Sequence, residues 1–204
     1  MSIGTWLKPR FQDLVMRQMN PLRPETVEAA EGDVLEIGFG TALNLELYGS
    51  GVRSVTGVDP MEIGDVAKIS RRMAAAPFPV EHRTLRADGG LPFDAGRFDT
   101  VITTWTLCSI PDAHAALVEM RRVLKPGGRY VFVEHGLAEK PGTAKWQDRV
   151  NPLWNRISDG CNINRKIDRM VEDGGFELAS MERFRARGPG LFAQMYRGIA
   201  TRAA

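Results

Sequence analysis

Apolar residues along the chain follow two alternating patterns, which together predict a protein built from alternating strands and helices. Short apolar runs between glycines or charged residues predict strands over residues 33–37, 53–58, 80–86, 99–104 and 129–134. Apolar residues three or four positions apart predict intervening helices over residues 41–48, 61–75 and 112–125. Such alternation predicts parallel strands joined by right-handed crossovers, with ligands bound at the carboxyl ends of the strands.

The two ends of the chain depart from this alternation. Ahead of the first strand, the apolar spacing predicts an amphipathic helix over residues 3–19 and a short helix over 24–31. Past residue 136 it predicts helices over 141–159 and 163–173, then strands over 176–184 and 191–201. The turn sequence Arg-Gly-Pro-Gly between the last two strands favours an antiparallel hairpin. We therefore predict an α/β fold with a doubly wound, mostly parallel, Rossmann-like sheet and a C-terminal antiparallel hairpin.

Length and composition narrow the class of protein. The 204 residues and their ordinary composition predict a single domain over residues 1–204. Cys108 and Cys161 are too few for a disulfide framework, and no group of Cys and His has zinc-like spacing, so we predict a reducing compartment and no metal. A net charge of +2 gives no reason to expect nucleic acid as a partner. The sequence shows no apolar run of membrane-spanning length and no secretory leader, which favours a cytoplasmic location.

Arginine is concentrated near the C-terminus, where five arginines after Met181 face one acid, Glu182. This stretch is either a basic edge for an anionic substrate or membrane surface, or a charged strand edge that faces solvent. We favour the second interpretation.

The most informative segment is the junction where the first strand runs directly into the glycine loop Gly38–Thr41. Glycines at the end of a strand let the backbone approach a ligand closely, and a helix starting directly afterwards adds positive dipole character. A dinucleotide fingerprint needs a small residue where this chain has Leu43, and Glu36 would repel a pyrophosphate. Glu36 instead suits a ligand that carries an ammonium group.

Two acids follow the next two predicted strands. Asp59, which precedes Pro60, can accept hydrogen bonds from both hydroxyls of a ribose, or it can cap the helix that follows. Asp88, which precedes Gly89, can accept a hydrogen bond from the exocyclic amine of adenine, or it can shape a turn. Both acids therefore point to a nucleoside, each with a structural alternative.

The order and spacing of these segments resemble a known series of motifs. The segments are VLEIGFGT, VTGVDP, RADGGLPF, FDTVITTWTLCSIPD and VLKPGGRYVFVEHG. As a set, they resemble the motifs of class I S-adenosylmethionine-dependent methyltransferases over about residues 33–136. The resemblance implies a helical cap over residues 1–32, a cofactor-binding core over 33–136, and substrate-side helices with the closing hairpin over 137–204.

The resemblance also implies how the cofactor S-adenosylmethionine is held. The glycine loop would contact its methionine part, Asp59 its ribose and Asp88 its adenine, and two threonines would lie near the transferred methyl. The expected cofactor-binding residues are Glu36, Gly38, Gly40, Thr41, Asp59, Pro60, Asp88, Gly89, Thr103 and Thr104. The family often has glycine where this chain has Ala42.

The acceptor is expected beside the ends of the fourth and fifth strands. The candidate substrate-binding residues are Trp105, Cys108, Trp146 and Trp154, and the candidate general bases are His135 and Asp159. Each has a structural alternative as a core, hydrogen-bonding or turn residue. The two tryptophans and the Asp-Gly-Cys turn at 159–161 resemble the subgroup of animal alkyl-thiol methyltransferases and their bacterial relatives, which favours a thiol acceptor.

We therefore predict an S-adenosylmethionine-dependent methyltransferase that acts on a small-molecule acceptor, and three alternatives stay open. The basic C-terminal edge and the amphipathic N-terminal helix allow peripheral membrane contact and N-methylation of phosphatidylethanolamine, although the short apolar stripe of that helix favours packing or a lid. A methyltransferase-like protein can also bind ligands without catalysis. A nicotinamide-dependent oxidoreductase is disfavoured by Leu43 and Glu36. The sequence does not set the oligomeric state.

Overall fold

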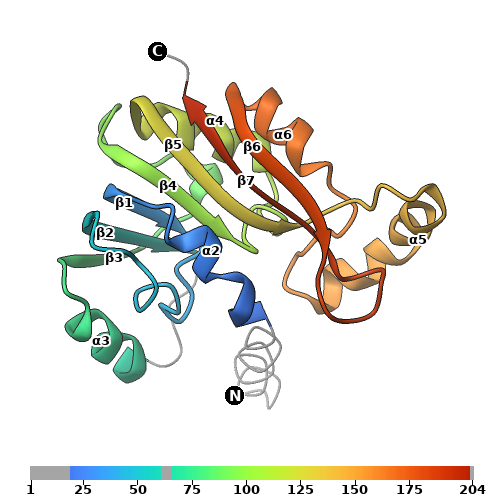
Figure 1. Ribbon diagram of the computed structural model, residues 1–204, viewed down its shortest axis with the longest axis horizontal. Helices are drawn as coiled ribbons and strands as arrows, with labels where there is room; N and C mark the ends of the chain where they lie inside the picture. Colours follow the sequence, from blue (N-terminus) through green and yellow to red (C-terminus); the bar gives the residue numbers. More distant parts are fainter. Residues whose placement is uncertain (1–18, 61–65, 203–204) are drawn as a thin grey trace.

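The computed structural model describes residues 19–60 and 66–202, and within them the chain forms a seven-stranded sheet (Figure 1). The strands are β1 (Gly32–Ile37), β2 (Val52–Asp59), β3 (Val80–Thr84), β4 (Phe98–Thr104), β5 (Leu124–His135), β6 (Phe176–Arg185) and β7 (Gln194–Arg202). Their order across the sheet is β3-β2-β1-β4-β5-β7-β6. The first five strands are parallel, and β7 runs antiparallel to both β5 and β6. The predicted Rossmann-like sheet with its closing hairpin is confirmed.

Helices cover both faces of this sheet. They are η1 (Asn20–Leu22), α2 (Pro24–Val27), α3 (Val66–Ala75), η2 (Ala87–Gly89), α4 (Ala113–Val123), α5 (Pro141–Ile157) and α6 (Ile167–Asp173). In β5, Val131 packs in one core cluster with Val27 of α2, whereas its neighbours Tyr130 and Phe132 pack in another with Leu117 of α4. Because successive strand residues point to opposite faces, α2 and α4 cover opposite faces of the sheet. Figure 1 shows α6 beside α4.

The segment after the glycine loop differs from its prediction. Residues 41–48 form turns instead of the expected helix. Ala42 has a φ of 60°, in the left-handed region that a right-handed helix does not use. In place of helical hydrogen bonds, a side chain from another element binds this backbone: Arg72 of α3 donates a hydrogen bond to the carbonyl oxygen of Thr41 at 2.6 Å. No helix N-terminus therefore faces the ligand from this segment.

Other boundaries shift by smaller amounts. The helix expected over 24–31 ends at Val27, and the one expected over 163–173 begins at Ile167. The helix expected over residues 3–19 lies, except for Met19, outside the described residues, as do residues 61–65. Among the helices that the structure describes, none is long and apolar enough to cross a membrane.

Candidate functional site

The glycine loop lies at the carboxyl edge of the sheet, where β1 runs between β2 and β4. Ile37 at the end of β1 is in register with Val58 of β2 and with Thr103 of β4. Parallel strands present their carboxyl ends at one edge, so the residues that follow these strands come together. We call this the cofactor edge, formed by residues 36–48, Asp59, residues 88–89 and Thr104.

The two glycines of the loop are required for different reasons. Both have positive φ, 81° at Gly38 and 52° at Gly40. A Cβ atom on Gly38 would lie 1.9 Å from Oγ1 of Thr106, so packing excludes any side chain there. A Cβ atom on Gly40 would have Gly38 O, at 3.9 Å, as its nearest heavy atom. The space over Gly40 is therefore open, as a ligand held against the loop backbone requires.

Asp59 joins the end of β2 to the glycine loop. Its Oδ2 accepts a hydrogen bond from the backbone N–H of Gly40 at 3.0 Å. The carboxylate thus holds the loop in place from the position where the predicted ribose contact would be made. The alternative role, capping the next helix, involves residues 61–65 outside the described residues.

Asp88 lies in η2, after β3, where its carboxylate is already engaged. Arg86 forms an ion pair with it at 2.8 Å, and the backbone N–H of Asp112 donates to Oδ2 at 3.4 Å. Burial alone would raise the pKa of Asp88, but the hydrogen bonds from Arg86 and Asp112 outweigh it and lower the pKa. Asp88 is therefore a charged acceptor, and its contact with adenine stays a prediction.

A buried hydrogen-bond network lies beneath the glycine loop. Glu36 Oε1 accepts from Asn44 at 2.8 Å, and its Oε2 accepts from the Tyr48 hydroxyl at 2.7 Å. Asn44 also donates to Oγ1 of Thr104 at 3.2 Å. Arg23 donates to Oδ1 of Asn44 at 2.7 Å and to Thr104 Oγ1 at 3.1 Å. The sequence identified Glu36 and Thr104, but gave no signal for the other three, which have no motif spacing.

The charge of this network depends on pH near neutrality. Burial raises the pKa of Glu36 to about 7, although Tyr48, Arg23 and Asn44 oppose this by stabilising the carboxylate. Burial also lowers the pKa of Arg23 to about 10. A cationic ligand group near the loop would favour the ionised form of Glu36. The open loop, the two strand-end carboxylates and this buried acid together fit the ammonium, ribose and adenine of S-adenosylmethionine.

The two threonines at the end of β4 point to different places. Thr104 belongs to the network beneath the loop, whereas Thr103 Oγ1 is hydrogen-bonded to the Tyr130 hydroxyl at 2.8 Å in the core shared with α4. Trp105, the next residue, has a φ of 54°, which is rare for a bulky side chain. The Arg23 guanidinium lies 4.9 Å from the centre of its ring. The structure thus places Thr104 in the cofactor edge and Trp105 beside it, whereas the Thr103 side chain lies in the core.

Three groups that are scattered in the sequence meet beyond β4 and β5. Cys108 follows β4, His135 ends β5, and Cys161 follows α5. The two sulfur atoms lie 3.6 Å apart, and Cys161 Sγ lies 3.7 Å from His135 Nδ1. The hydrogen bond between the thiols raises the pKa of Cys108 and lowers that of Cys161. Spacing along the chain could not show this cluster, because the cysteines are 53 residues apart.

We call the region beyond β4 and β5 the acceptor side; it holds Cys108, His135, Cys161, Trp154 and Phe192. The remaining residues predicted for it separate into two groups. Trp154 stacks on Phe192 with ring centres 4.2 Å apart and packs against both cysteines. Trp146 is 55% exposed, with the Arg149 guanidinium 5.2 Å from its ring centre. Asp159 is exposed in the turn after α5, with a φ of 47°. Trp154 therefore lies beside the two cysteines, whereas the prediction of Trp146 as a pocket wall is not supported by its position.

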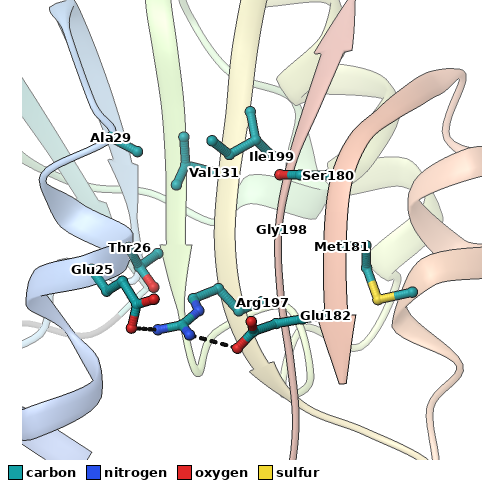
Figure 2. Close-up of a pocket in the computed structure, with 10 residues that line it drawn as sticks. All are labelled: Glu25, Thr26, Ala29, Val131, Ser180, Met181, Glu182, Arg197, Gly198 and Ile199. Atoms are coloured by element: carbon teal, nitrogen blue, oxygen red, sulfur yellow. Dashed lines mark hydrogen bonds and ion pairs between the residues drawn. The ribbon is translucent and has the colours of Figure 1, made fainter. Parts of the chain in front are cut away.

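A separate groove of about 340 Å³ lies between α2 and strands β5 to β7 (Figure 2). None of the predicted site residues lines it. Figure 2 shows Arg197 at its floor, paired with Glu25 and Glu182. Arg183 is likewise paired with Asp168 and Glu139, and Arg202 donates to backbone carbonyls. Arg185 donates to the carbonyl oxygen of Gly188. Four of the five C-terminal arginines are thus engaged within the fold, which weakens the interpretation of a basic binding edge.

Comparisons with known proteins agree with this geometry. Residues 35–132 match the model of a family described as a methyltransferase domain. Human thiol S-methyltransferase TMT1A is 32% identical over 163 residues, covering 75% of this chain and 63% of the relative. A phosphatidylethanolamine N-methyltransferase from Cereibacter sphaeroides is 29% identical over 153 residues, covering 74% of this chain and 73% of the relative. The chain thus spans less than two thirds of the length of the human relative.

A solved structure has the same fold. It is a geranyl diphosphate C-methyltransferase from Streptomyces coelicolor A3(2) in complex with Mg²⁺, geranyl diphosphate and S-adenosyl-L-homocysteine. It matches with a TM-score of 0.68 at 18% identity, covering 92% of this chain and 79% of that chain. From its sheet order, its glycine loop and these matches, the chain contains a methyltransferase domain of the class I, S-adenosylmethionine-dependent type.

Proposed function

We propose that the protein transfers a methyl group from S-adenosylmethionine to the sulfur of a small-molecule thiol. The observation that carries the choice of acceptor is the 32% identity to a thiol S-methyltransferase over three quarters of this chain. The groups beyond β4 and β5 support this choice, because two buried thiols pack there with the stacked rings of Trp154 and Phe192. Such surroundings suit an apolar thiol better than a charged headgroup.

On the cofactor edge, the chain's task is to bind and orient. Bound S-adenosylmethionine would supply an electrophilic methyl group on a positively charged sulfonium. The open backbone at Gly40 would receive the methionine part, with Glu36 as the nearby negative charge. Asp59 fixes the loop through Gly40 N–H and would accept from the ribose. Orientation of this kind supplies a large part of the catalysis of a displacement reaction.

On the acceptor side, the chain's task is to hold a thiolate and exclude water. In the reaction the acceptor sulfur forms a bond to the methyl carbon while the bond from that carbon to the sulfonium breaks. The acceptor proton leaves beforehand, to a side chain or to solvent. Trp154 and Phe192 form an apolar wall there, and a desolvated thiolate is a stronger nucleophile than a hydrated one.

The proton acceptors predicted from the sequence stay proposals. His135 is half-buried with its Nδ1 beside Cys161, whereas Asp159 is exposed in a turn. If either is the base, His135→Ala or Asp159→Asn would remove the corresponding limb of the pH–rate profile. Full activity of both variants across pH would exclude both roles.

Labelled methyl transfer tests the proposed acceptor. Purified protein with methyl-labelled S-adenosylmethionine is offered a panel of alkyl and aryl thiols or, in parallel, vesicles that contain phosphatidylethanolamine. We expect labelled thioether and no labelled lipid. Labelled lipid alone would favour the second candidate, which the 29% identity to a phosphatidylethanolamine N-methyltransferase supports. Cofactor binding without any product, measured by calorimetry, would favour a non-catalytic role.

A further inference from the structure

The group formed by Cys108, His135 and Cys161 has the composition of a soft-metal site. Each residue offers one ligand atom, and these atoms all lie within 4.8 Å of one another. Thiolate sulfur and imidazole nitrogen are the ligands that Zn²⁺ prefers in proteins. In the part of the chain that the structure describes, this is also where both cysteines meet.

Two of the three distances between the ligand atoms match those around a tetrahedral ion, and the third lies within 4.8 Å. With Zn–S bonds of about 2.3 Å and Zn–N bonds of about 2.0 Å, a tetrahedron places its sulfurs about 3.8 Å apart and sulfur about 3.5 Å from nitrogen. The sulfurs of Cys108 and Cys161 lie 3.6 Å apart, and Cys161 Sγ lies 3.7 Å from His135 Nδ1. A disulfide would need the sulfurs at about 2.0 Å. The observed separations therefore fit shared coordination better than a covalent bond.

The loop that carries Cys108 is fixed by a buried carboxylate. Glu134, which is fully buried, accepts hydrogen bonds from the backbone N–H groups of residues 106, 107 and 108 at 3.0–3.1 Å. The neighbouring residue of the chain is His135, so one strand end positions two of the three ligands. Supporting hydrogen bonds of this kind orient the ligands of protein metal sites.

The loop that carries Cys161 is tied directly to the Cys108 loop. The carbonyl oxygen of Cys108 accepts from the backbone N–H of Asn162 at 2.9 Å and from its side-chain amide at 3.1 Å. Trp154 packs against the cluster that holds both cysteines, and its buried Nε1–H, which makes no full hydrogen bond within the described residues, faces the Cys161 thiol and helps to lower the pKa of that thiol. A metal-bound thiolate is an acceptor that would satisfy such a donor.

We propose that Cys108, His135 and Cys161 bind one soft divalent cation, with Zn²⁺ as the best match. Binding requires both thiols to lose their protons to solvent and His135 to coordinate through neutral Nδ1. Three protein ligands leave one tetrahedral position for water or an exogenous ligand, which is the pattern of catalytic rather than closed structural zinc sites. The site assigns His135 a ligand role in place of that of a general base, and it replaces the metal-free prediction made from sequence spacing.

Cobalt binding tests the site without any measurement of activity. Tag-free, chelator-treated protein is titrated with Co²⁺ and, in competition, with Zn²⁺. We expect one equivalent of Co²⁺, a sulfur-to-cobalt charge-transfer band, and displacement of Co²⁺ by Zn²⁺. Cys161→Ser and His135→Ala should each weaken Co²⁺ binding at least tenfold, whereas His114→Ala, which changes an exposed histidine on α4, should leave it unchanged. An unchanged Co²⁺ affinity in Cys161→Ser, or the absence of a sulfur-to-cobalt band in the wild type, would overturn the proposal.

A second measurement uses only the wild-type chain, in case a variant fails to fold. The rate at which a thiol reagent labels the two cysteines is compared with and without Zn²⁺. We expect at least tenfold protection, reversed by a chelator. Equal labelling rates, or recovery of the cysteines as a disulfide from freshly purified protein, would overturn the site. Neither result depends on the identity of the methyl acceptor.

Discussion

The cofactor edge and the acceptor side lie on the same sheet but are built from opposite kinds of chemistry. Beneath the glycine loop, Glu36 and Arg23 are buried with their charges balanced and hydrogen-bonded through Asn44. Beyond β5, the buried groups are two thiols packed under an indole ring. The first arrangement suits a charged ligand held in a fixed orientation, and the second suits a soft nucleophile without its water. Each half can therefore be disrupted separately.

The largest expected effect is the difference in stability between alanine substitutions at the two glycines of the loop. Gly38→Ala places a methyl group 1.9 Å from Oγ1 of Thr106 at a positive φ, so we expect a loss of about 3 kcal/mol or more in the free energy of unfolding. Gly40→Ala meets open space and should lose only about 1 kcal/mol, from backbone strain. Denaturant unfolding measures both. The Gly40 variant should fold yet bind S-adenosylmethionine at least tenfold more weakly; equal stability of the two variants would refute this distinction.

Asp59 tests the cofactor edge without touching the acceptor side. Asp59→Ala removes the acceptor for Gly40 N–H and the expected ribose contact, so cofactor affinity should fall by about 1–3 kcal/mol, roughly 5- to 150-fold. Calorimetric titration with S-adenosylhomocysteine measures this loss. Asp59→Asn, which keeps one acceptor oxygen, should lose less. A folded alanine variant with wild-type affinity would exclude Asp59 from the site.

Glu36 couples the cofactor edge to pH. Its pKa in the folded protein, about 7, lies above its ordinary value of 4.5, so the folded state holds the proton more tightly than the unfolded state. The resulting stabilisation is complete below about pH 4.5 and is lost as pH rises through 7. Glu36→Gln mimics the protonated form. Above pH 8, its free energy of unfolding should therefore exceed that of the wild type by about 2–3 kcal/mol.

The same variant should bind the cofactor more weakly, since it lacks the negative charge. Unfolding curves and calorimetric titrations at pH 5.5 and 8.5 check both effects. Parallel pH dependence of wild type and Glu36→Gln would show that this carboxyl does not titrate near neutrality.

The smallest expected effect is confined to the acceptor side. Trp154→Phe reduces the aromatic surface that stacks on Phe192, and we expect the KM for a hydrophobic thiol to rise about fivefold, roughly 1 kcal/mol. The KM for S-adenosylmethionine should not change. Trp146→Phe, which alters a mostly exposed ring on the same helix, is the matched control and should leave both values unchanged. A change in cofactor KM alone would contradict the separation of the two halves.

The sequence predicted the cofactor edge better than the acceptor side for a physical reason. The loop, Asp59 and Asp88 each follow a strand, and parallel strands bring their carboxyl ends together whatever lies between them. Which side chains lie beneath the loop depends on the path of the chain through residues 41–48. That path is a series of turns with a positive φ at Ala42, where the sequence predicted a helix. Cys108, His135 and Cys161 meet only because the loop after α5 returns to the loop after β4, where Asn162 binds the carbonyl oxygen of Cys108. Their proximity is a property of tertiary structure that no local spacing records.

The stacking of Trp154 on Phe192 ties α5 to the turn between β6 and β7. Both residues of this apolar wall, Trp154 and Phe192, come from the part of the chain after residue 136, and neither belongs to the glycine loop. Relatives could therefore exchange that turn and that helix during evolution, altering which acceptor fits, while inheriting the cofactor edge unchanged. For the same reason, we propose a library confined to residues 186–193 as the way to change which acceptor this protein takes.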